Sequence, residues 1–246
     1  MIENNKIYNE NCLTTMSKID DCSVDLIITS PPYNKNFYTK TKKISKKDSS
    51  NFRTINYDSY NDNLSPIYYA QWQTKILNEC CRILKETGSI FYNHMDILSD
   101  HNTIHPSFIY NFPVKQVLVW DRFNTPKLDK SYFFPINEFV FWIKKSKNSK
   151  TKFYRNKMFF KNSIIRIGAD TKNPHPAPFP IQLANNFVLG CTDENDLVYD
   201  PFIGSGTTAI ASLNNNRNFI GSEISTKYFE MSIKKLNENK SQQKLF

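Results

Sequence analysis

Hydrophobic residues fall into short β-branched runs that alternate with longer stretches at helical spacing. The runs predict strands at 24–29, 89–92, 114–120, 138–143, 197–199 and 218–221. The longer stretches predict helices at 65–86, 177–190, 206–214 and 225–237. Such alternation predicts an α/β fold with an open, largely parallel sheet covered by helices on both faces. Ligands of these sheets bind beyond the carboxyl ends of the strands.

Composition excludes several classes of protein. A hydrophobic content of 39% is enough for a core and rules out wholesale disorder. There is no apolar run of about 18 residues, which argues against a membrane span, and the first residues do not form a charged-then-apolar leader. The five cysteines lack Cys-x-x-Cys spacing and the histidines lack a metal-ligand spacing. We therefore expect a cytoplasmic protein with reduced thiols and no metal.

The positive charge is concentrated in two segments. The chain carries a net charge of +9, of which residues 144–172 hold +9 and residues 35–61 hold +5, while the remainder sums to −5. Aromatic residues are interleaved with the basic ones, a combination that suits phosphate contact with base stacking, although solvated surface loops are the alternative interpretation. The candidate nucleic-acid contacts are Lys40, Lys42, Lys43, Lys46, Lys47, Arg53, Lys150, Lys152, Arg155 and Lys157.

A glycine-containing loop joins the predicted strand 197–199 to the predicted helix 206–214. It reads Asp-Pro-Phe-Ile-Gly-Ser-Gly-Thr-Thr over 200–208. Glycines let the main chain approach a ligand, and a helix start offers N–H groups. Glu223 ends the following strand, 23 residues after Asp200, which is the spacing of a βαβ unit that presents a carboxylate to ribose hydroxyls. The lack of Gly-Lys-Ser/Thr excludes a phosphate loop. A tight turn with a surface glutamate is the alternative.

A second loop, Ser30-Pro31-Pro32-Tyr33, follows the strand 24–29. Consecutive prolines fix two φ angles and remove two N–H donors, so local carbonyls are available as acceptors. Ser30 adds a side-chain acceptor and Tyr33 a stacking face. The loop suits a flat heterocycle whose exocyclic amino group donates to Ser30 and to the Pro31 carbonyl. A rigid turn with an aromatic lid is the alternative.

Together the two loops resemble the signature motifs of the S-adenosylmethionine-dependent DNA amino-methyltransferases. Their order, with the catalytic motif first, is similar to the circularly permuted β class of restriction–modification enzymes. The resemblance implies a Rossmann-like methyltransferase fold with a mostly parallel, twisted sheet of about seven strands, one of them antiparallel. It implies one catalytic domain over 1–246, S-adenosylmethionine as cofactor and double-stranded DNA as partner, with no membrane, and leaves a companion restriction endonuclease open.

The resemblance also assigns roles to residues. The catalytic residues are Ser30, Pro31, Pro32 and Tyr33. The residues expected at the cofactor are Asn11, Cys12, His175, Phe179, Asp200, Phe202, Gly204, Gly206, Thr207, Thr208 and Glu223. Where the family usually has Gly-Asp-Cys, this chain has Glu10-Asn11-Cys12, which offers the cofactor adenine an uncharged acceptor. Residues 144–172 are expected to be a short target-recognition segment, and residues 35–61 a basic DNA-contacting loop.

The identity of the first catalytic residue favours one target base. In the family, Ser is commoner there among cytosine-N4 enzymes and Asp among adenine-N6 enzymes. Ser30 therefore favours methylation of N4 on a flipped cytosine, with adenine N6 as the alternative at the same site. No cysteine follows a proline, which excludes the C5-cytosine enzymes. A catalytically silent DNA-binding protein is disfavoured by the intact motifs, and a glutamine or RNA methyltransferase is a further alternative, although glutamine enzymes usually have the reverse motif order.

Overall fold

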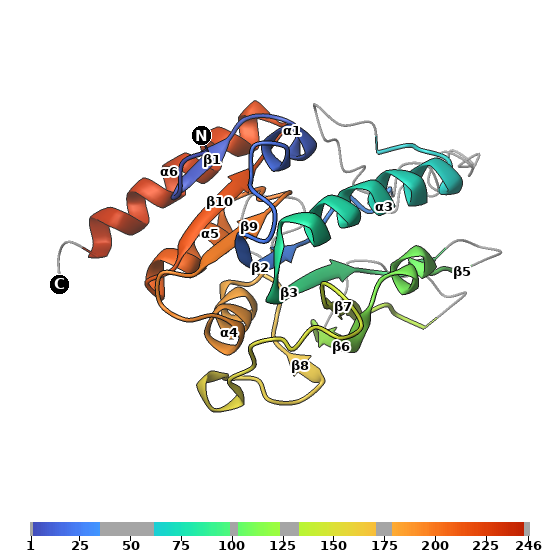
Figure 1. Ribbon diagram of the computed structural model, residues 1–246. Coiled ribbons are helices and arrows are strands. Elements are labelled where there is room, and N and C mark those ends of the chain that lie inside the picture. The colour runs from blue at the N-terminus through green and yellow to red at the C-terminus, as the bar shows by residue number, and fades with distance from the viewer. Residues whose placement is uncertain (1, 35–61, 99–102, 124–132, 171–178, 244–246) are drawn as a thin grey trace, which may run out of the picture.

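The computed structural model describes residues 2–34, 62–98, 103–123, 133–170 and 179–243. An eight-stranded sheet crosses the molecule in the order β1-β10-β9-β2-β3-β7-β6-β8 (Figure 1). In that order its strands are β1 (Lys6–Tyr8), β10 (Asn218–Ser222), β9 (Leu197–Asp200), β2 (Val24–Thr29), β3 (Leu84–His94), β7 (Asn137–Ile143), β6 (Val114–Asp121) and β8 (Ile164–Arg166). Within this sheet only β7 runs against its neighbours. The Rossmann-like fold with one antiparallel strand is thus confirmed.

Helices cover both faces of the sheet, as expected (Figure 1). One face is covered by α1 (Cys12–Met16) and α3 (Pro66–Ile83). The other is covered by α4 (Ile181–Cys191), α5 (Thr207–Asn214) and α6 (Thr226–Gln243). The smaller elements are β4 (Ile97–Leu98), which pairs with β5 (Thr103–Ile104), and the 3-10 turns η1 (Ser107–Asn111) and η2 (Arg155–Lys157).

The central strands are buried on both faces, which explains their continuous apolar character. All six residues of β2 are buried. Ile27 packs in the cluster beneath α3, whereas Leu26 and Ile28 pack in the cluster beneath α4. In the second cluster the rings of Phe91 and Phe187 stack with centroids 3.9 Å apart. Helices on both faces therefore bury the central strands.

Most elements lie where the hydrophobic pattern predicts them. The main strands agree within a few residues, and β2 agrees at both ends. The helix predicted over 65–86 ends at Ile83, because Leu84 is already extended and begins β3. The last helix runs beyond its predicted end at 237 to Gln243. The edge strands β1 and β8 were not predicted, since three residues carry too little pattern.

The order in which strands are added to the sheet reverses between β9 and β2. From β9 the order continues to β10 and β1 on one side, and from β2 to β3 on the other. The loops after β9 and β2 consequently leave neighbouring strands at the same edge. Such a switch point is where open α/β sheets bind ligands. In the described part of the chain, no helix is both long and apolar enough to cross a bilayer.

Candidate active site and cofactor loop

The Ser-Pro-Pro-Tyr loop is fixed to the carboxyl edge of the sheet by its neighbours. The Tyr69 hydroxyl of α3 donates to the carbonyl oxygen of Pro32 at 2.8 Å. Asn34 closes the loop with a φ of 58°, a conformation that Asn tolerates better than most residues. Its amide exchanges two hydrogen bonds with the backbone of Leu64, at 2.7 and 2.8 Å. The loop that carries the four predicted catalytic residues is therefore held in one conformation.

Three polar side chains meet at the Tyr33 hydroxyl. Ser30 Oγ lies 2.6 Å from it, Asn93 Nδ2 donates to it at 2.7 Å, and it donates to Glu138 Oε2 at 3.0 Å. Asn93 Nδ2 also donates to the same carboxylate oxygen at 2.6 Å. The other carboxylate oxygen of Glu138 forms an ion pair with Arg122 at 2.7 Å. Glu138, Asn93 and Tyr33 are all buried, so the contacts are shielded from water.

The ring of Tyr33 is more enclosed than the sequence suggests. Only 5% of Tyr33 is exposed, and its ring packs on His94 with centroids 4.7 Å apart and a tilt of 38°. The Tyr69 hydroxyl lies 2.7 Å from His94 Nε2, a hydrogen bond that holds the histidine ring. One face of the Tyr33 ring is thus already in contact with protein. Ser30 and Pro32 are half-buried, and Pro31 is buried.

The glycine loop lies after β9 and is tied to the end of β10. Gly204 N donates to Glu223 Oε2 at 3.0 Å, and Ser225 N donates to Glu223 Oε1 at 2.9 Å. Gly204 and Gly206 have φ of 52° and 85°, which favour glycine. Gly221 of β10 is needed for close approach, since a Cβ there would lie 2.3 Å from Cδ1 of Ile203. The loop therefore follows a path that these glycines permit.

Asp200 begins the glycine loop as a buried acid. Its carboxylate accepts from Thr208 Oγ1 at 2.6 Å and from Phe202 N at 3.0 Å. Burial, which disfavours the charged form, raises the pKa of Asp200 to about 6, although these hydrogen bonds oppose the shift. The acid holds the loop to the start of α5.

Most of the predicted cofactor residues are brought together at this edge. The glycine loop supplies Asp200, Phe202, Gly204, Gly206, Thr207 and Thr208, and Glu223 joins them through Gly204. The N-terminal element lies beside Glu223, whose N–H donates to the Tyr8 carbonyl at 3.0 Å. Within that element Asn11 accepts from Leu13 N as the cap of α1, and Cys12 is buried.

Of the two remaining predicted cofactor residues, only Phe179 lies within the described residues. Phe179 packs against Trp120 of β6, with centroids 5.9 Å apart, and His175 lies outside the described residues. The remaining set fits a nucleoside ligand, because a half-buried carboxylate at the end of β10 can accept from ribose hydroxyls. The start of α5, where no side chain caps the helix, offers N–H groups.

The candidate DNA contacts of the second basic segment lie at the opposite edge of the sheet. Because β7 is antiparallel, the segment that follows it begins at the amino edge. There Lys152 forms ion pairs with Asp196 at 2.6 Å and Asp193 at 3.0 Å, and Lys157 pairs with Asp193 at 3.6 Å. Although partial burial opposes it, the hydrogen bonds to both aspartates raise the pKa of Lys152. Lys150 and Arg155 belong to the same stretch.

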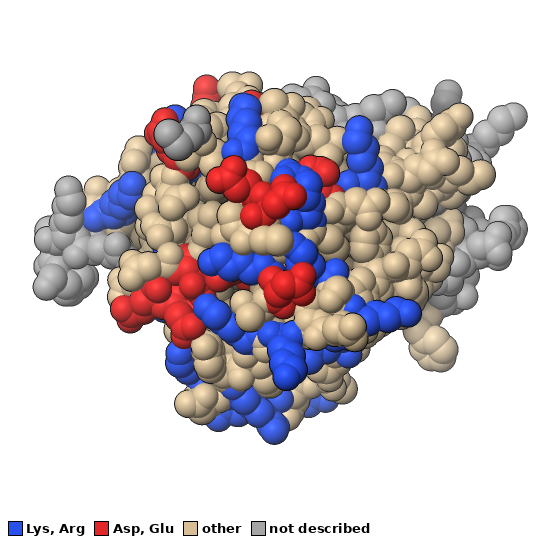
Figure 2. Space-filling view, in the orientation of Figure 1, with Lys and Arg blue, Asp and Glu red and all other residues tan. Residues whose placement is uncertain are grey.

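Lys150, Lys152, Arg155 and Lys157 therefore lie away from the catalytic loop, and their contact with DNA stays a prediction. The antiparallel direction of β7 places them at the amino edge of the sheet. In Figure 2 basic side chains gather toward the bottom of the view, where Figure 1 shows β8, and acidic side chains are interspersed above them. Lys40, Lys42, Lys43, Lys46, Lys47 and Arg53 lie outside the described residues.

Other groups that can meet DNA lie at the catalytic edge. β8 returns there beside the end of β6, and the Arg166 side chain is 70% exposed. Three aromatic side chains at the ends of β6 and β7 are also exposed. They are Phe123, Phe133 and Phe134.

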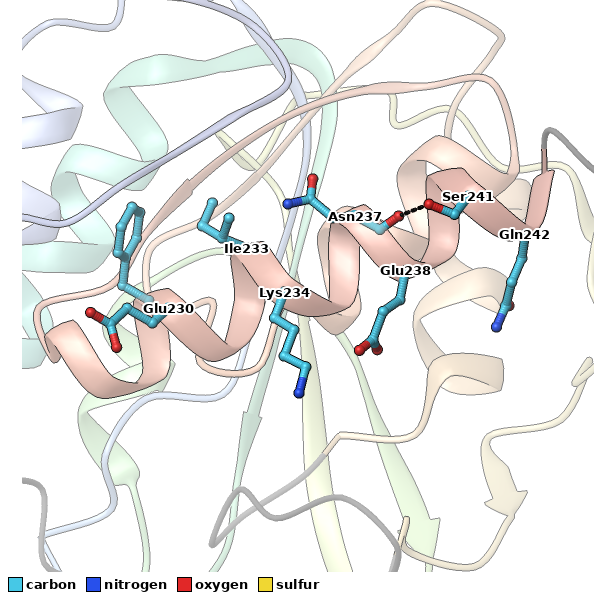
Figure 3. A pocket seen from close by; sticks show the side chains of 8 residues that line it. Glu230, Ile233, Lys234, Asn237, Glu238, Ser241 and Gln242 are labelled. Atoms are coloured by element: carbon cyan, nitrogen blue, oxygen red, sulfur yellow. Dashed lines mark hydrogen bonds between the residues drawn. The ribbon is translucent and has the colours of Figure 1, made fainter.

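A shallow groove runs along α6 (Figure 3). All of its lining side chains belong to that helix, including Ile233, Lys234 and Glu238. Ser241 Oγ donates to the carbonyl of Asn237 across its end at 2.9 Å. Polar groups on one exposed helix face do not point toward a common ligand. We therefore place the candidate active site at the two loops and not in this groove. Among the described residues there is no cluster of three metal ligands.

Sequence reasoning missed Asn93, Arg122 and Glu138. Asn93 follows a predicted strand at its carboxyl end, a position that could have marked it. Glu138 begins an apolar strand, where an acid suggests only a solvated strand end. Only the antiparallel pairing of β7 with β3, which sets Val140 opposite Asn93, brings that end to the catalytic loop.

Comparison with known proteins places the chain in a family. Residues 24–234 match the family model described as DNA methylase. The chain belongs to this family. A type II methyltransferase of Bacillus subtilis, M.BglII, is 30% identical over 93% of this chain and 68% of its own length. The DNA adenine methyltransferase YhdJ of Escherichia coli is 25% identical over 94% of this chain and 82% of its own.

Solved structures confirm the fold. The cytosine-N4-specific PvuII DNA methyltransferase superposes with a TM-score of 0.74 and 19% identity, over 95% of this chain and 86% of that one. A DNA modification methylase of Thermus thermophilus in complex with S-adenosylmethionine gives a TM-score of 0.68 and 19% identity, over 95% and 93%. The chain is therefore an S-adenosylmethionine-dependent DNA amino-methyltransferase of the restriction–modification type, as the motifs predict.

Proposed function

We propose that this DNA methyltransferase transfers the methyl group to the exocyclic N4 of a cytosine that has been flipped out of duplex DNA. The observation that carries the proposal is the half-buried Ser30 hydroxyl at the carboxyl end of β2, where adenine enzymes more often have a carboxylate. Similarity in fold to the cytosine-N4-specific PvuII enzyme supports it.

The geometry suits attack by a weakly nucleophilic amine. The lone pair of an aromatic amine is delocalised into its ring, so the amine needs acceptors that draw it toward tetrahedral geometry. Ser30 Oγ and the Pro31 carbonyl are the proposed acceptors, and Tyr33 limits the pocket for the base. S-adenosylmethionine supplies an electrophilic methyl group on a sulfonium. The protein's contribution is then orientation and stabilisation of positive charge on the amine.

DNA is proposed to approach the carboxyl edge of the sheet, since a flipped base must reach Ser30 from there. We infer that the recognition contacts come from residues 35–61 and from the later part of 144–172, around Arg166, rather than from Lys150 to Lys157. Exposed Phe123, Phe133 and Phe134 can stack with bases at this edge. Phosphate contacts from the basic residues would position the duplex.

Adenine N6 is the second candidate target. The similarity to the adenine methyltransferase YhdJ favours it, and adenine also presents an exocyclic amine to the same acceptors. A ring with a larger outline would have to fit beside Tyr33, whose ring is held by His94.

The deciding experiment is incubation with isotopically labelled S-adenosylmethionine and genomic DNA, followed by nucleoside analysis. We expect label in N4-methylcytosine. Label in N6-methyladenine would overturn the choice of base and leave the enzyme class intact. Thermal stabilisation by the cofactor without any labelled nucleoside would favour a silent DNA-binding protein. Protection of the modified DNA from a nuclease encoded beside the gene would identify the proposed companion endonuclease.

A further inference from the structure

The hydrogen bonds through Tyr33 run in one direction, from Ser30 to Tyr33 and from Tyr33 to Glu138. Tyr33 has a single hydroxyl proton, and it donates that proton to Glu138 Oε2 at 3.0 Å. The 2.6 Å contact between Ser30 and Tyr33 must then use the Ser30 proton. Asn93 Nδ2 reaches Ser30 Oγ only at 3.4 Å, because its short contacts are with Tyr33 and Glu138. Ser30 Oγ can consequently accept from a group outside the network.

Asn93 and Arg122 hold the carboxylate in place. The amide of Asn93 must turn its NH₂ group to Glu138, because the carboxylate has no proton to give; Nδ2 lies 2.6 Å from Oε2. Arg122 binds Oε1 at 2.7 Å and balances the charge of a residue that is only 6% exposed. Arg122 is itself held by a hydrogen bond to the Pro135 carbonyl at 3.3 Å. Both oxygens of Glu138 are therefore engaged, and the charge stays beside Tyr33.

We propose that Glu138 is a positioning residue and the terminal proton acceptor for methyl transfer, acting through Tyr33 and Ser30. By fixing the donor direction, it makes Ser30 present only lone pairs to the target amine. The inference rests on the proposed methyltransferase function and deepens it, because it holds for either target base. It also gives Tyr33 a second task besides contact with the base.

Each proton that moves has a donor and an acceptor among these contacts. The amine lone pair forms the N–C bond while the electron pair of the breaking S–C bond stays on sulfur. The excess proton on nitrogen passes to Ser30 Oγ, the Ser30 proton passes to Tyr33, and the Tyr33 proton passes to Glu138 Oε2. Ser30 and Tyr33 end neutral, and Glu138 ends as a carboxylic acid that returns its proton to solvent after product release.

The kinetic test is a double-mutant cycle under single-turnover conditions with duplex DNA. Tyr33→Phe removes one oxygen and keeps the ring and the ion pair, while Glu138→Gln keeps the shape and removes the acceptor. We expect each to lower the methyl-transfer rate on the order of 10²-fold, with Kd for cofactor and DNA unchanged. We expect the double variant to lose no more of the methyl-transfer rate than either single variant loses. Each of the two substitutions already breaks the same proton relay, so adding the second removes nothing further.

Glu79→Gln is the matched control, because Glu79 pairs with Arg82 at the other end of α3. We expect it to retain the wild-type rate. A Tyr33→Phe enzyme with the wild-type rate, or losses that multiply in the double variant, would overturn the relay while the wild-type activity still supports the proposed function. A wild-type protein that transfers no label would instead overturn the function.

A second readout needs neither cofactor nor DNA. The wild type, the two single variants and the double variant are unfolded in urea. The unfolding midpoints then give the interaction free energy between Tyr33 and Glu138. We expect the destabilisations to be non-additive, because both substitutions remove the same buried hydrogen bond. Additive destabilisation would show that the two side chains do not share that bond and would overturn the network on which the proposal depends.

Discussion

At the residue scale, the active site depends on contacts among side chains that are far apart in sequence. Tyr33 lies in the motif that sequence reasoning identifies, yet its hydroxyl is set by Asn93 and Glu138. Its ring is set by His94. The motif therefore supplies the proposed catalytic groups, and the surrounding strands decide which atoms accept and which donate.

Replacement of Tyr33 by Ala is expected to abolish methyl transfer and to leave cofactor binding largely intact. The substitution removes both the ring beside the target base and the link to Glu138, whereas the glycine loop leaves a different strand. Calorimetric titration with S-adenosylmethionine and a filter assay for methylated DNA would measure the two effects. A fully active variant would refute the role of Tyr33.

The cysteines differ in expected reactivity. Cys12, Cys80 and Cys191 are buried, and burial raises the pKa of Cys12 and of Cys191 to about 12. Burial also raises the pKa of Cys81 to about 11. Only Cys22 is exposed among the five. A thiol reagent applied to the native protein at neutral pH should therefore label Cys22 first, as peptide mass mapping would reveal. Equal labelling of Cys80 would contradict the described core.

At the element scale, the site is built where strands end. The loops after β2 and β9 lie side by side because these strands pair, with Leu26 opposite Val198. The antiparallel β7 adds its first residues to the same edge. Strand order and strand direction together thus gather one catalytic loop, one cofactor loop and one buried carboxylate.

Gly221→Ala is expected to weaken cofactor binding and to destabilise the protein by about 1–3 kcal/mol. The added Cβ would collide with Ile203, so the glycine loop would have to shift away from β10. Unfolding midpoints and cofactor titrations would measure both effects. Gly168→Ala is a suitable control, because a Cβ there meets nothing within 4 Å.

Asp200 is expected to give the protein a specific pH dependence. Its pKa in the folded protein is about 6, above the usual 3.8, so between these values the folded state binds more protons than the unfolded state. This group therefore favours folding in acid, and its contribution declines as the pH rises through about 6. The difference in unfolding temperature between wild type and Asp200→Asn should change across that window.

At the scale of the whole molecule, the two edges of the sheet have different tasks. The carboxyl edge carries both functional loops and exposed aromatic side chains. At the amino edge, Asp25 is buried beneath Lys85 and Lys152, and Asp193 and Asp196 complete a cluster of ion pairs. The net charge of a segment therefore does not reveal which of its cations can reach DNA.

Arg166→Gln and Lys152→Gln should distinguish a residue that binds DNA at the carboxyl edge from one that stabilises the fold at the amino edge. For Arg166→Gln we expect weaker DNA binding and a salt dependence reduced by about 0.9 in log–log slope for each phosphate that the variant no longer binds. For Lys152→Gln we expect an unchanged slope and a stability loss of about 1–3 kcal/mol, since Asp193 and Asp196 lose their partner. Binding titrations at several salt concentrations would measure the slopes, and unfolding midpoints would measure the stability. An altered slope for Lys152→Gln would restore that residue to the DNA-binding surface.

The sequence by itself determined the class of fold and the cofactor, and it predicted both candidate loops, because these depend on local patterns. Hydrophobic periodicity marks strands and helices, and Ser-Pro-Pro-Tyr and the glycine loop are each continuous in sequence. Tertiary structure alone decided that Glu138 and Asn93 meet Tyr33, and that Lys152 lies far from them in the fold. Strand order and the reversed direction of β7 decide both, and neither property is encoded in the local pattern of any single segment.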